Sequence, residues 1–249
     1  MIEFEEGDDA LYQIRNFQGT IKVMETAVVP AVQQEFFRLN HDITGIPDHK
    51  ELPILCDLLF EESVSEENIK SILVKLTNST EVKAFRSVER FALEAEGELR
   101  SFALLCLEIS RMRLENSLSD EEVGYIAGGL GGFDQKLRFF MMVFPSGEEG
   151  FTSRQLQLTQ DEFRTAFESV GGVPEVFDAG PLFLAMVFLL PVTVDFRPEA
   201  EKCLKEINQY GNFLFPAVYA TNVEIPTYPQ ILDIISRMRT TDSDDDELL

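Results

Sequence analysis

Apolar side chains recur at helical spacing in the N-terminal part of the chain. Over residues 8–40 this spacing predicts a helix that Pro30 interrupts, because proline lacks the N–H that a helix interior requires. Glycine and proline at 41–50 indicate a loop, and the apolar positions of 51–60 predict a further short helix.

The clearest helical pattern covers residues 65–115. Ser65, followed by two glutamates, predicts an N-cap with an acidic first turn, which the helix dipole favours. Polar residues at 77–80 end that helix and cap the next one. Two more apolar stripes follow, the first at Val82, Phe85, Val88 and Leu93 and the second at Leu99, Phe102, Leu105 and Ile109.

The starts of these two helices, Ser79-Thr80-Glu81-Val82-Lys83 and Gly97-Glu98-Leu99-Arg100, resemble the helix starts of HEAT-type repeats. The resemblance covers roughly residues 50–115 and implies an α-solenoid that binds proteins. The large side chains of Phe85 and Phe102 stand where that family has small ones. An ordinary helical bundle explains the same periodicity equally well.

The pattern changes across residues 117–135, where four glycines fall within 128–132. Beyond them the chain predicts strands and helices in alternation. The expected strands are 136–144, 155–159, 173–178, 182–194 and 213–219, and the expected helices follow Thr159, Pro198 and Ile231. Apart from 155–159, a hairpin partner, the order matches the split βαβ arrangement of ferredoxin-like folds.

The sequence therefore predicts an α+β protein with a helical, HEAT-like N-terminal region followed by a ferredoxin-like sandwich. The expected divisions are a helical region at 1–120, a glycine-rich linker at 121–135, an α+β region at 136–239 and a disordered acidic tail at 240–249. Residues 182–190 form the most continuous apolar run, which predicts a central strand with both faces covered.

Charge narrows the range of partners. The chain carries 44 acidic against 21 basic side chains, a formal net charge of −23, which disfavours nucleic acid and anionic membranes as partners. The apolar run at 182–190 is too short for a membrane-spanning helix of about 20 residues, and the acidic start is unlike a signal peptide. The three cysteines lie far apart in apolar surroundings, so we expect buried thiols in a cytoplasmic protein.

Few residues suggest chemistry. His41-Asp42 and Asp48-His49 bracket one loop and are weak candidates for metal ligands, although their spacing matches no helix-face motif and solvated side chains explain them better. The glycines of 128–132 match neither a P-loop nor a dinucleotide fingerprint and indicate a linker or a helix stop. Adjacent acidic doublets do not face each other on a helix. The sequence predicts no catalytic residue and no cofactor.

One basic region stands out against the acidic background. Lys83, Arg86 and Arg90 fall on one face of a predicted helix, and Arg100 begins the next helix. Such a face could dock an acidic partner, for which the chain's own Asp242–Glu247 is one candidate. Ordinary ion pairing, such as Arg90 with Glu94, is the simpler interpretation.

Two hypotheses about function follow. The first is a non-enzymatic protein-interaction or scaffold protein, based on the stacked helices and the missing catalytic groups. The alternative is a small-molecule-binding or enzymatic domain that uses the C-terminal sheet. A concave or flat apolar surface would favour the first hypothesis, and a deep cleft with converging charged groups would favour the second.

Overall fold

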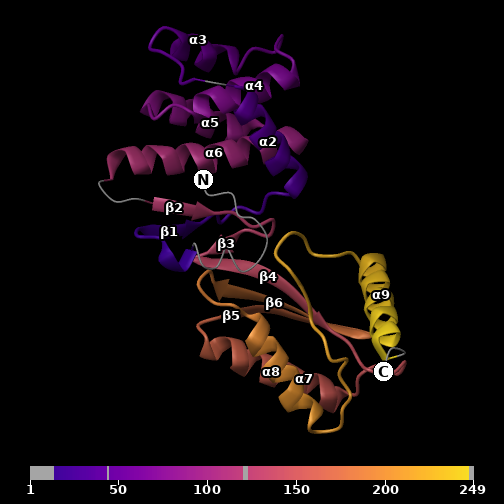
Figure 1. Ribbon diagram of the computed structural model, residues 1–249. Coiled ribbons are helices and arrows are strands. Elements are labelled where there is room, and N and C mark those ends of the chain that lie inside the picture. Colours follow the sequence, from indigo (N-terminus) through magenta and orange to yellow (C-terminus); the bar gives the residue numbers. More distant parts are fainter. Residues whose placement is uncertain (1–13, 44, 120–122, 247–249) are drawn as a thin grey trace. The chain divides into compact units, whose positions relative to one another are not determined.

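The computed structural model describes residues 14–43, 45–119 and 123–246, the last six of these by their backbone alone. The chain divides into two compact units, residues 1–137 and 138–249. Helices dominate the first unit and a sheet with helices forms the second, so the protein belongs to the α+β class (Figure 1). Among the described residues, no helix is both long and apolar enough to span a membrane.

Unit 1 stacks its helices in layers (Figure 1). Its elements are β1 (Thr20–Val23), α2 (Pro30–Asp42), α3 (Glu51–Leu58), α4 (Glu66–Thr77), α5 (Val82–Glu94), α6 (Gly97–Leu118), β2 (Val123–Ile126) and β3 (Gly132–Phe133). Helix α4 begins at the predicted N-cap, where the hydroxyl of Ser65 accepts a hydrogen bond from the backbone N–H of Asn68. The helices predicted between residues 51 and 115 are therefore confirmed.

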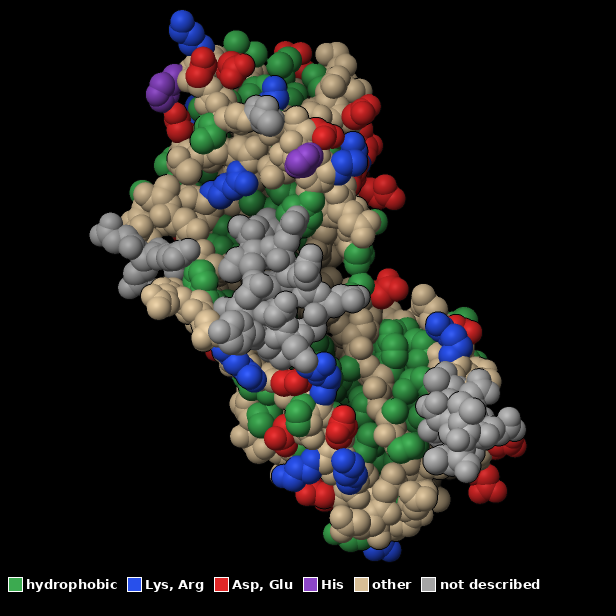
Figure 2. Space-filling view, viewed as in Figure 1, with side chains coloured by type: hydrophobic (Ala, Val, Ile, Leu, Met, Phe, Trp, Pro, Cys, Tyr) green, Lys and Arg blue, Asp and Glu red, His purple; other side chains and the backbone are tan. Residues whose placement is uncertain are grey.

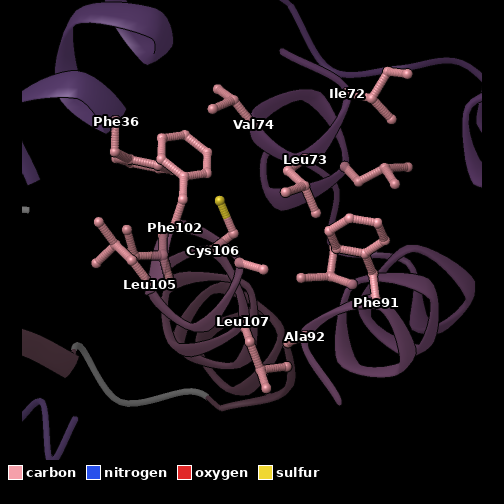
Figure 3. Close-up of a cluster of buried hydrophobic side chains, with 14 of the residues drawn as sticks. Phe36, Ile72, Leu73, Val74, Phe91, Ala92, Phe102, Leu105, Cys106 and Leu107 are labelled. Carbon is pink, nitrogen blue, oxygen red and sulfur yellow. The ribbon is translucent and has the colours of Figure 1, made fainter. Parts of the chain in front are cut away.

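The core of unit 1 forms where α6 lies among the other helices (Figure 3). Phe102 of α6 is fully buried, and its ring centroid lies 6.1 Å from that of Phe36 on α2. Leu73 of α4 and Ala92 of α5 are also fully buried in this cluster. Helix α6 also buries residues beside its predicted stripe, such as Ala103 and Leu107, so its buried surface extends around most of its circumference.

Two short segments of unit 1 differ from their predicted structure. Residues 20–23, expected in a helix, form β1, and residues 123–126, expected in the linker, form β2. The two strands pair in parallel from Thr20 opposite Val123 to Val23 opposite Ile126. Each segment is too short to show a period by itself, and its partner lies a whole helical region away in the sequence. The strand conformation thus depends on tertiary pairing that local periodicity does not report.

The glycine cluster is closely packed and is no loose linker. Gly131 has a φ of +67°, and a Cβ there would overlap the carbonyl oxygen of Glu25. A Cβ on Gly132 would overlap the carbonyl oxygen of Lys136 and the side chain of Val23. Glycine is required at these two positions because the 131–132 backbone lies directly against its neighbours in unit 1.

Unit 2 contains most of a five-stranded sheet, with helices α7 and α8 on one face (Figure 1). Its elements are β4 (Lys136–Val143), which starts in the last two residues of unit 1, α7 (Ser153–Ser169), β5 (Val173–Gly180), β6 (Phe183–Pro191), α8 (Arg197–Asn208), β7 (Tyr219–Thr221) and α9 (Tyr228–Asp246). The strand order is β3-β4-β6-β5, with β7 also paired to β4. From β4 onward the chain follows the predicted β-α-β-β-α-β sequence of elements.

Strand β6 is central, as the continuous apolar run predicted. It lies between β4 and β5, and every residue from Phe183 to Leu190 is buried. Leu184, Met186 and Phe188 on one face join Phe163 and Phe167 of α7 in the core of this unit. Burial on both faces explains why its sequence does not alternate.

The start of α7 corrects another prediction. Residues 155–159, expected as a strand, lie inside α7, which begins at Ser153 and not after Thr159. Thr152 caps the helix: its hydroxyl accepts from the N–H of Gln155, and the Gln155 side chain accepts from the N–H of Thr152. This reciprocal capping box starts the helix seven residues before the predicted one. Of the alternating polar residues, Gln157 is exposed, whereas Thr159 is buried.

Two C-terminal boundaries also differ from the sequence prediction. The strand expected at 213–219 is β7 at Tyr219–Thr221, with only an isolated bridge between Pro145 and Leu214 before it. The backbone of residues 240–246, assigned by composition to a disordered tail, continues α9. Residues 247–249 lie outside the described part, and the tail prediction stays a prediction for them.

Candidate functional site

The exposed face of α5 carries three of the four predicted binding residues. Ala84, Val88, Phe91 and Ala92 bury the opposite face against the core, which fixes the helix orientation. Lys83, Arg86 and Arg90 consequently point away from the core and are exposed. Two apolar side chains share this outer surface, Val82 at 59% exposure and Leu93 at 73%. The surface therefore mixes cations with uncovered aliphatic groups.

The cations of α5 differ in how firmly they are held. Arg90 donates to Glu94 at 2.8 Å, and its guanidinium lies 4.2 Å from the ring centroid of Phe60. Arg86 donates to Glu89 at 2.5 Å. The predicted Arg90–Glu94 pair thus forms, but both acids are on the same helix and the guanidinium groups keep other donors free for a partner.

Lys83 and Arg100 are paired with no acidic side chain among the described residues. Neither side chain forms an ion pair or hydrogen bond with any residue that the structure describes, and both are exposed. Arg100 lies in the first turn of α6, the helix packed beside α5. The four predicted residues therefore belong to two adjacent helices, with three on one helix face.

The loop residues considered as metal ligands are used in other ways. The carboxylate of Asp48 accepts from the N–H groups of Lys50 and Glu51 at the start of α3, and these bonds lower its pKa. Nδ1 of His49 lies 2.9 Å from Glu81, and Asp42 pairs with Arg38 at 3.8 Å. Figure 2 shows the two histidines, His41 and His49, as separate surface side chains.

No candidate metal centre emerges from that loop. In the ranges for which positions are described, no group of three His, Cys, Asp or Glu side chains converges in a way that could hold an ion. Asp48 acts as a helix cap, which explains an acid at this position without any ligand.

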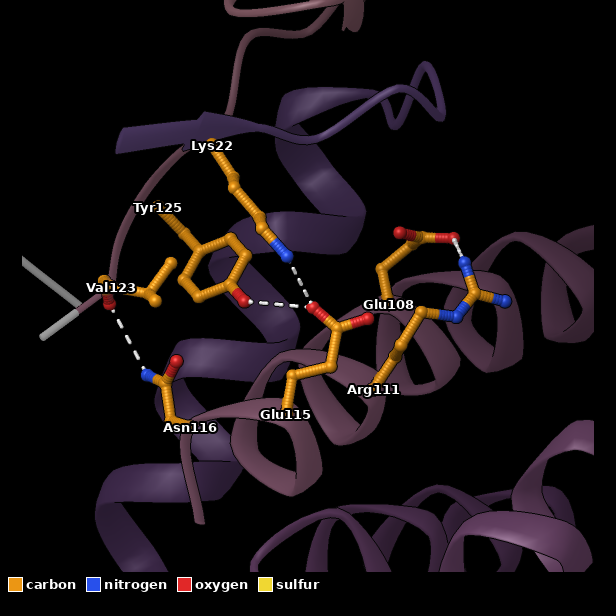
Figure 4. A network of polar contacts seen from close by, with 7 residues as sticks. All are labelled: Lys22, Glu108, Arg111, Glu115, Asn116, Val123 and Tyr125. Carbon is orange, nitrogen blue, oxygen red and sulfur yellow. Dashed lines mark hydrogen bonds and ion pairs between the residues drawn. The ribbon is translucent and has the colours of Figure 1, made fainter. Parts of the chain in front are cut away.

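The structure reveals a polar network that the sequence did not predict (Figure 4). Glu115 of α6 accepts hydrogen bonds from Lys22 of β1 at 2.6 Å and from the hydroxyl of Tyr125 of β2 at 3.4 Å. Burial, with the Glu115 charge second, raises the pKa of Tyr125 to about 12. Glu108 lies about two turns before Glu115 on the same side of α6 and pairs with Arg111. Burial likewise raises the pKa of Glu108.

This network serves structure. It joins β1 and β2 to α6 through charged groups far apart in sequence, so no local motif could have indicated it. The residues drawn in Figure 4 include no serine, threonine, cysteine or histidine, and a tyrosine with a raised pKa stays protonated at neutral pH. Burial raises the pKa of the Cys106 thiol and raises the pKa of Cys203 to about 12, so these two thiols are poor nucleophiles at neutral pH.

A groove in unit 2 is the second site that sequence reasoning missed. It has a volume of about 730 Å³ and lies between α8 and the segment that leads to β7. Its apolar lining consists of Phe196, Ala200, Leu204, Pro216, Ala217 and Val218. Arg197, Glu201 and Lys205 of α8 add charge along it. Its size lies within the range of small-molecule sites.

Comparisons with known proteins identify no family. No family model matches the chain, and no curated protein matches it. Among solved structures, one similarity is to the REP-associated tyrosine transposase bound to a REP hairpin, at 12% identity and a TM-score of 0.32. The match covers 37% of this chain and 59% of that protein. A likeness this weak carries no argument about function.

Proposed function

We propose that this protein is a non-enzymatic interaction module whose helical unit binds an acidic partner segment on the outer face of α5. The observation that carries the proposal is the combination of uncovered aliphatic and cationic side chains on one helix face. Val82 and Leu93 are more than half exposed beside Lys83, Arg86 and Arg90. A purely solvated helix face does not need the two aliphatic groups.

Charge supports an acidic partner with apolar side chains. The chain has a net charge of −23, so a local group of cations attracts acidic segments that the rest of the molecule repels. The Phe60 ring holds the Arg90 guanidinium in place, which lowers the entropy lost on binding. Each exposed ion pair contributes roughly 0–1 kcal/mol, so we expect weak, salt-sensitive binding.

Three further elements of this proposal, namely protein binding by the helices, the class of partner and the cellular location, are based on the sequence. The resemblance of residues 50–115 to HEAT-type repeats implies protein binding and remains a prediction. The acidic composition argues for a protein partner over nucleic acid or a membrane surface. The widely spaced cysteines agree with a cytoplasmic protein.

A synthetic peptide can test the α5 site. The sequence of residues 240–249, which combines five acids with two terminal leucines, supplies a fluorescently labelled probe of the required chemistry. We expect fluorescence anisotropy to show binding at low salt that weakens as salt rises. The double variant Arg86→Glu/Arg90→Glu should lose this binding by charge repulsion.

A matched control distinguishes the site from general charge effects. Arg38 lies on α2 of the same unit and forms an i,i+4 pair with Asp42, as Arg90 does with Glu94. Arg38→Glu changes the net charge in the same direction at a different surface and should leave most of the binding intact. Equal binding by the parent chain and the double variant would refute the α5 site.

A second candidate function is small-molecule binding by unit 2. The groove of about 730 Å³ beside α8 favours it, because its size and its largely apolar lining with a few charged side chains are typical of small-molecule sites. This candidate is independent of the α5 site and can hold together with it.

A further inference from the structure

The walls of the α8 groove are held in place by contacts within unit 2. The Asn208 side chain donates to the carbonyl oxygen of Leu214 and accepts from its N–H, both at 2.9 Å. The rings of Phe144 and Phe215 stack with centroids 4.5 Å apart, and the N–H of Phe215 donates to the carbonyl oxygen of Phe144. These contacts hold the segment between α8 and β7, residues 209–218, against α8 and the end of β4. We call this stretch the return segment, and the groove that it lines does not depend on a ligand to form.

The return segment leaves the β-ladder where it lines the groove. Strand β4 pairs Met142 with Tyr219, but the bridge at Pro145 is to Leu214. From Met142 to Pro145 the chain advances three residues, while the paired chain advances five, from Leu214 to Tyr219. The return segment therefore has two more residues than its partner over this stretch, and it forms a bulge within residues 216–218. The N–H groups of Ala217 and Val218 bond to no atom of the described chain, and both residues line the groove.

The charged side chains along the groove differ in whether they form an ion pair with a described residue. Arg197 is held by Asp195 through bonds of 3.0 Å from Nε and from the terminal nitrogen. Lys205 and Glu201 stand one helical turn apart, in the order that favours pairing, yet no ion pair joins either to a described residue. Lys205 is therefore the cation available at the groove, with the backbone donors of the bulge on the other wall.

We propose that the α8 groove binds an amphipathic organic acid: a small molecule with an apolar body and one anionic group. The apolar body packs against Phe196, Leu204 and Val218. The anionic group accepts hydrogen bonds from Lys205 and from the N–H groups of Ala217 and Val218, which bond to nothing in the described part of the chain, and Glu201 repels it. This assignment rests on the second candidate function, small-molecule binding by unit 2, and names its ligand class.

Two compounds of the same shape and opposite charge test the assignment. The ¹⁵N-labelled full chain is titrated with 4-phenylbutyrate and, separately, with 4-phenylbutylamine, and amide chemical shifts are followed by NMR. We expect the acid to shift the amides of Ala217, Val218 and the groove side of α8. The amine should bind at least about tenfold more weakly, since one charge-assisted hydrogen bond is of that order.

Three variants locate the binding. Lys205→Gln should weaken binding of the acid about tenfold, because it removes the only unpaired cation among the described groove residues. Lys202→Gln, on the same helix but outside the groove lining, should bind as the parent does. Ala217→Leu should abolish binding by filling the groove. Lys202 and Lys205 are exposed, so melting curves should show both lysine variants folded.

The outcomes separate the two levels of the proposal. Equal affinity for amine and acid, or no effect of Lys205→Gln, overturns the acid assignment and leaves small-molecule binding by unit 2 standing. If neither compound shifts any groove amide at millimolar concentration, both the assignment and the second candidate function fail.

Discussion

The two units bury their cores by different routes. In unit 1, α4, α5 and α6 follow one another in sequence and pack as neighbours, so much of the core is made by consecutive segments. In unit 2, β6 is buried between β5, which precedes it directly, and β4, which lies beyond a helix and a strand. Consecutive packing leaves a regular helical pattern in the sequence, whereas a strand buried on both faces leaves only a continuous apolar run.

The surfaces of the two units differ in the same way. The candidate site of unit 1 is one convex helix face, where spacing along a single helix was enough to identify Lys83, Arg86 and Arg90. The groove of unit 2 is made by α8 and a segment that arrives after it, and it depends on a bulge at 216–218. A site built on one element can be read from sequence, and a site between elements requires the fold.

The largest effect should come from a charge in the central strand. Leu184 is fully buried and Val187 is 7% exposed, both on β6. Leu184→Asp or Val187→Asp should destabilise unit 2 by several kcal/mol, because an unpaired buried charge has no compensating partner. Thermal unfolding followed by circular dichroism measures the change.

The edge strand supplies the control. Val176 lies on β5 and is 49% exposed, so Val176→Asp should change stability by no more than about 0.5 kcal/mol. Unchanged melting of both β6 variants would show that this strand does not form the core of unit 2, and the comparison between the units would fail.

Local chemistry determined how far the sequence predicted the fold. Ser65 was identified as an N-cap because an acidic turn and an apolar stripe follow it, and the structure confirms that cap. The helix at Ser153–Ser169 was missed in part, because alternating side chains at 155–159 imitate a strand while Thr152 and Gln155 cap the helix earlier. The sequence contained both the capping residues and the alternating pattern, and the alternating pattern was given too much weight.

Long-range pairing lay beyond the sequence. Neither β1 nor β2 has an apolar pattern of its own, and each is a strand because of the other. The network around Glu115 follows from that pairing, since it joins Lys22 and Tyr125 only after the strands meet α6. The positions of the basic residues on α5 were predictable, but the exposure of Val82 and Leu93 beside them was visible only in the structure.

A second prediction tests whether the glycine cluster is packed or is a linker. Gly131→Ala should cost about 1–3 kcal/mol, because alanine is strained at a φ of +67° and its Cβ would overlap the backbone at Glu25. Gly147 serves as the matched control: an added Cβ there meets only one atom, 4.0 Å away. Chemical denaturation compares the free energies of unfolding, and equal values for the two alanine variants would restore the linker interpretation.

The smallest expected effect concerns an ion pair that spans the sheet of unit 2. Arg138 of β4 donates to Glu175 of β5 from Nε at 2.5 Å and from a terminal nitrogen at 2.9 Å, across the intervening β6. These hydrogen bonds hold the pKa of Glu175 below its usual value. By contrast, most ion pairs of unit 1 join residues three or four apart on one helix.

The depressed pKa gives the sign of the pH dependence. A carboxyl group with a lowered folded-state pKa stabilises the fold above its unfolded pKa of about 4.3, and this contribution disappears as the pH falls through the folded value. Glu175→Gln should therefore lower the free energy of unfolding by up to about 1 kcal/mol at pH 7, since the pair is partly exposed, and by progressively less as the pH falls below the unfolded value. Glu168→Gln, at an exposed position of α7, should show no such dependence. A constant difference between Glu175→Gln and the parent from pH 7 to pH 3 would mean that packing, and not charge, stabilises this contact across the sheet.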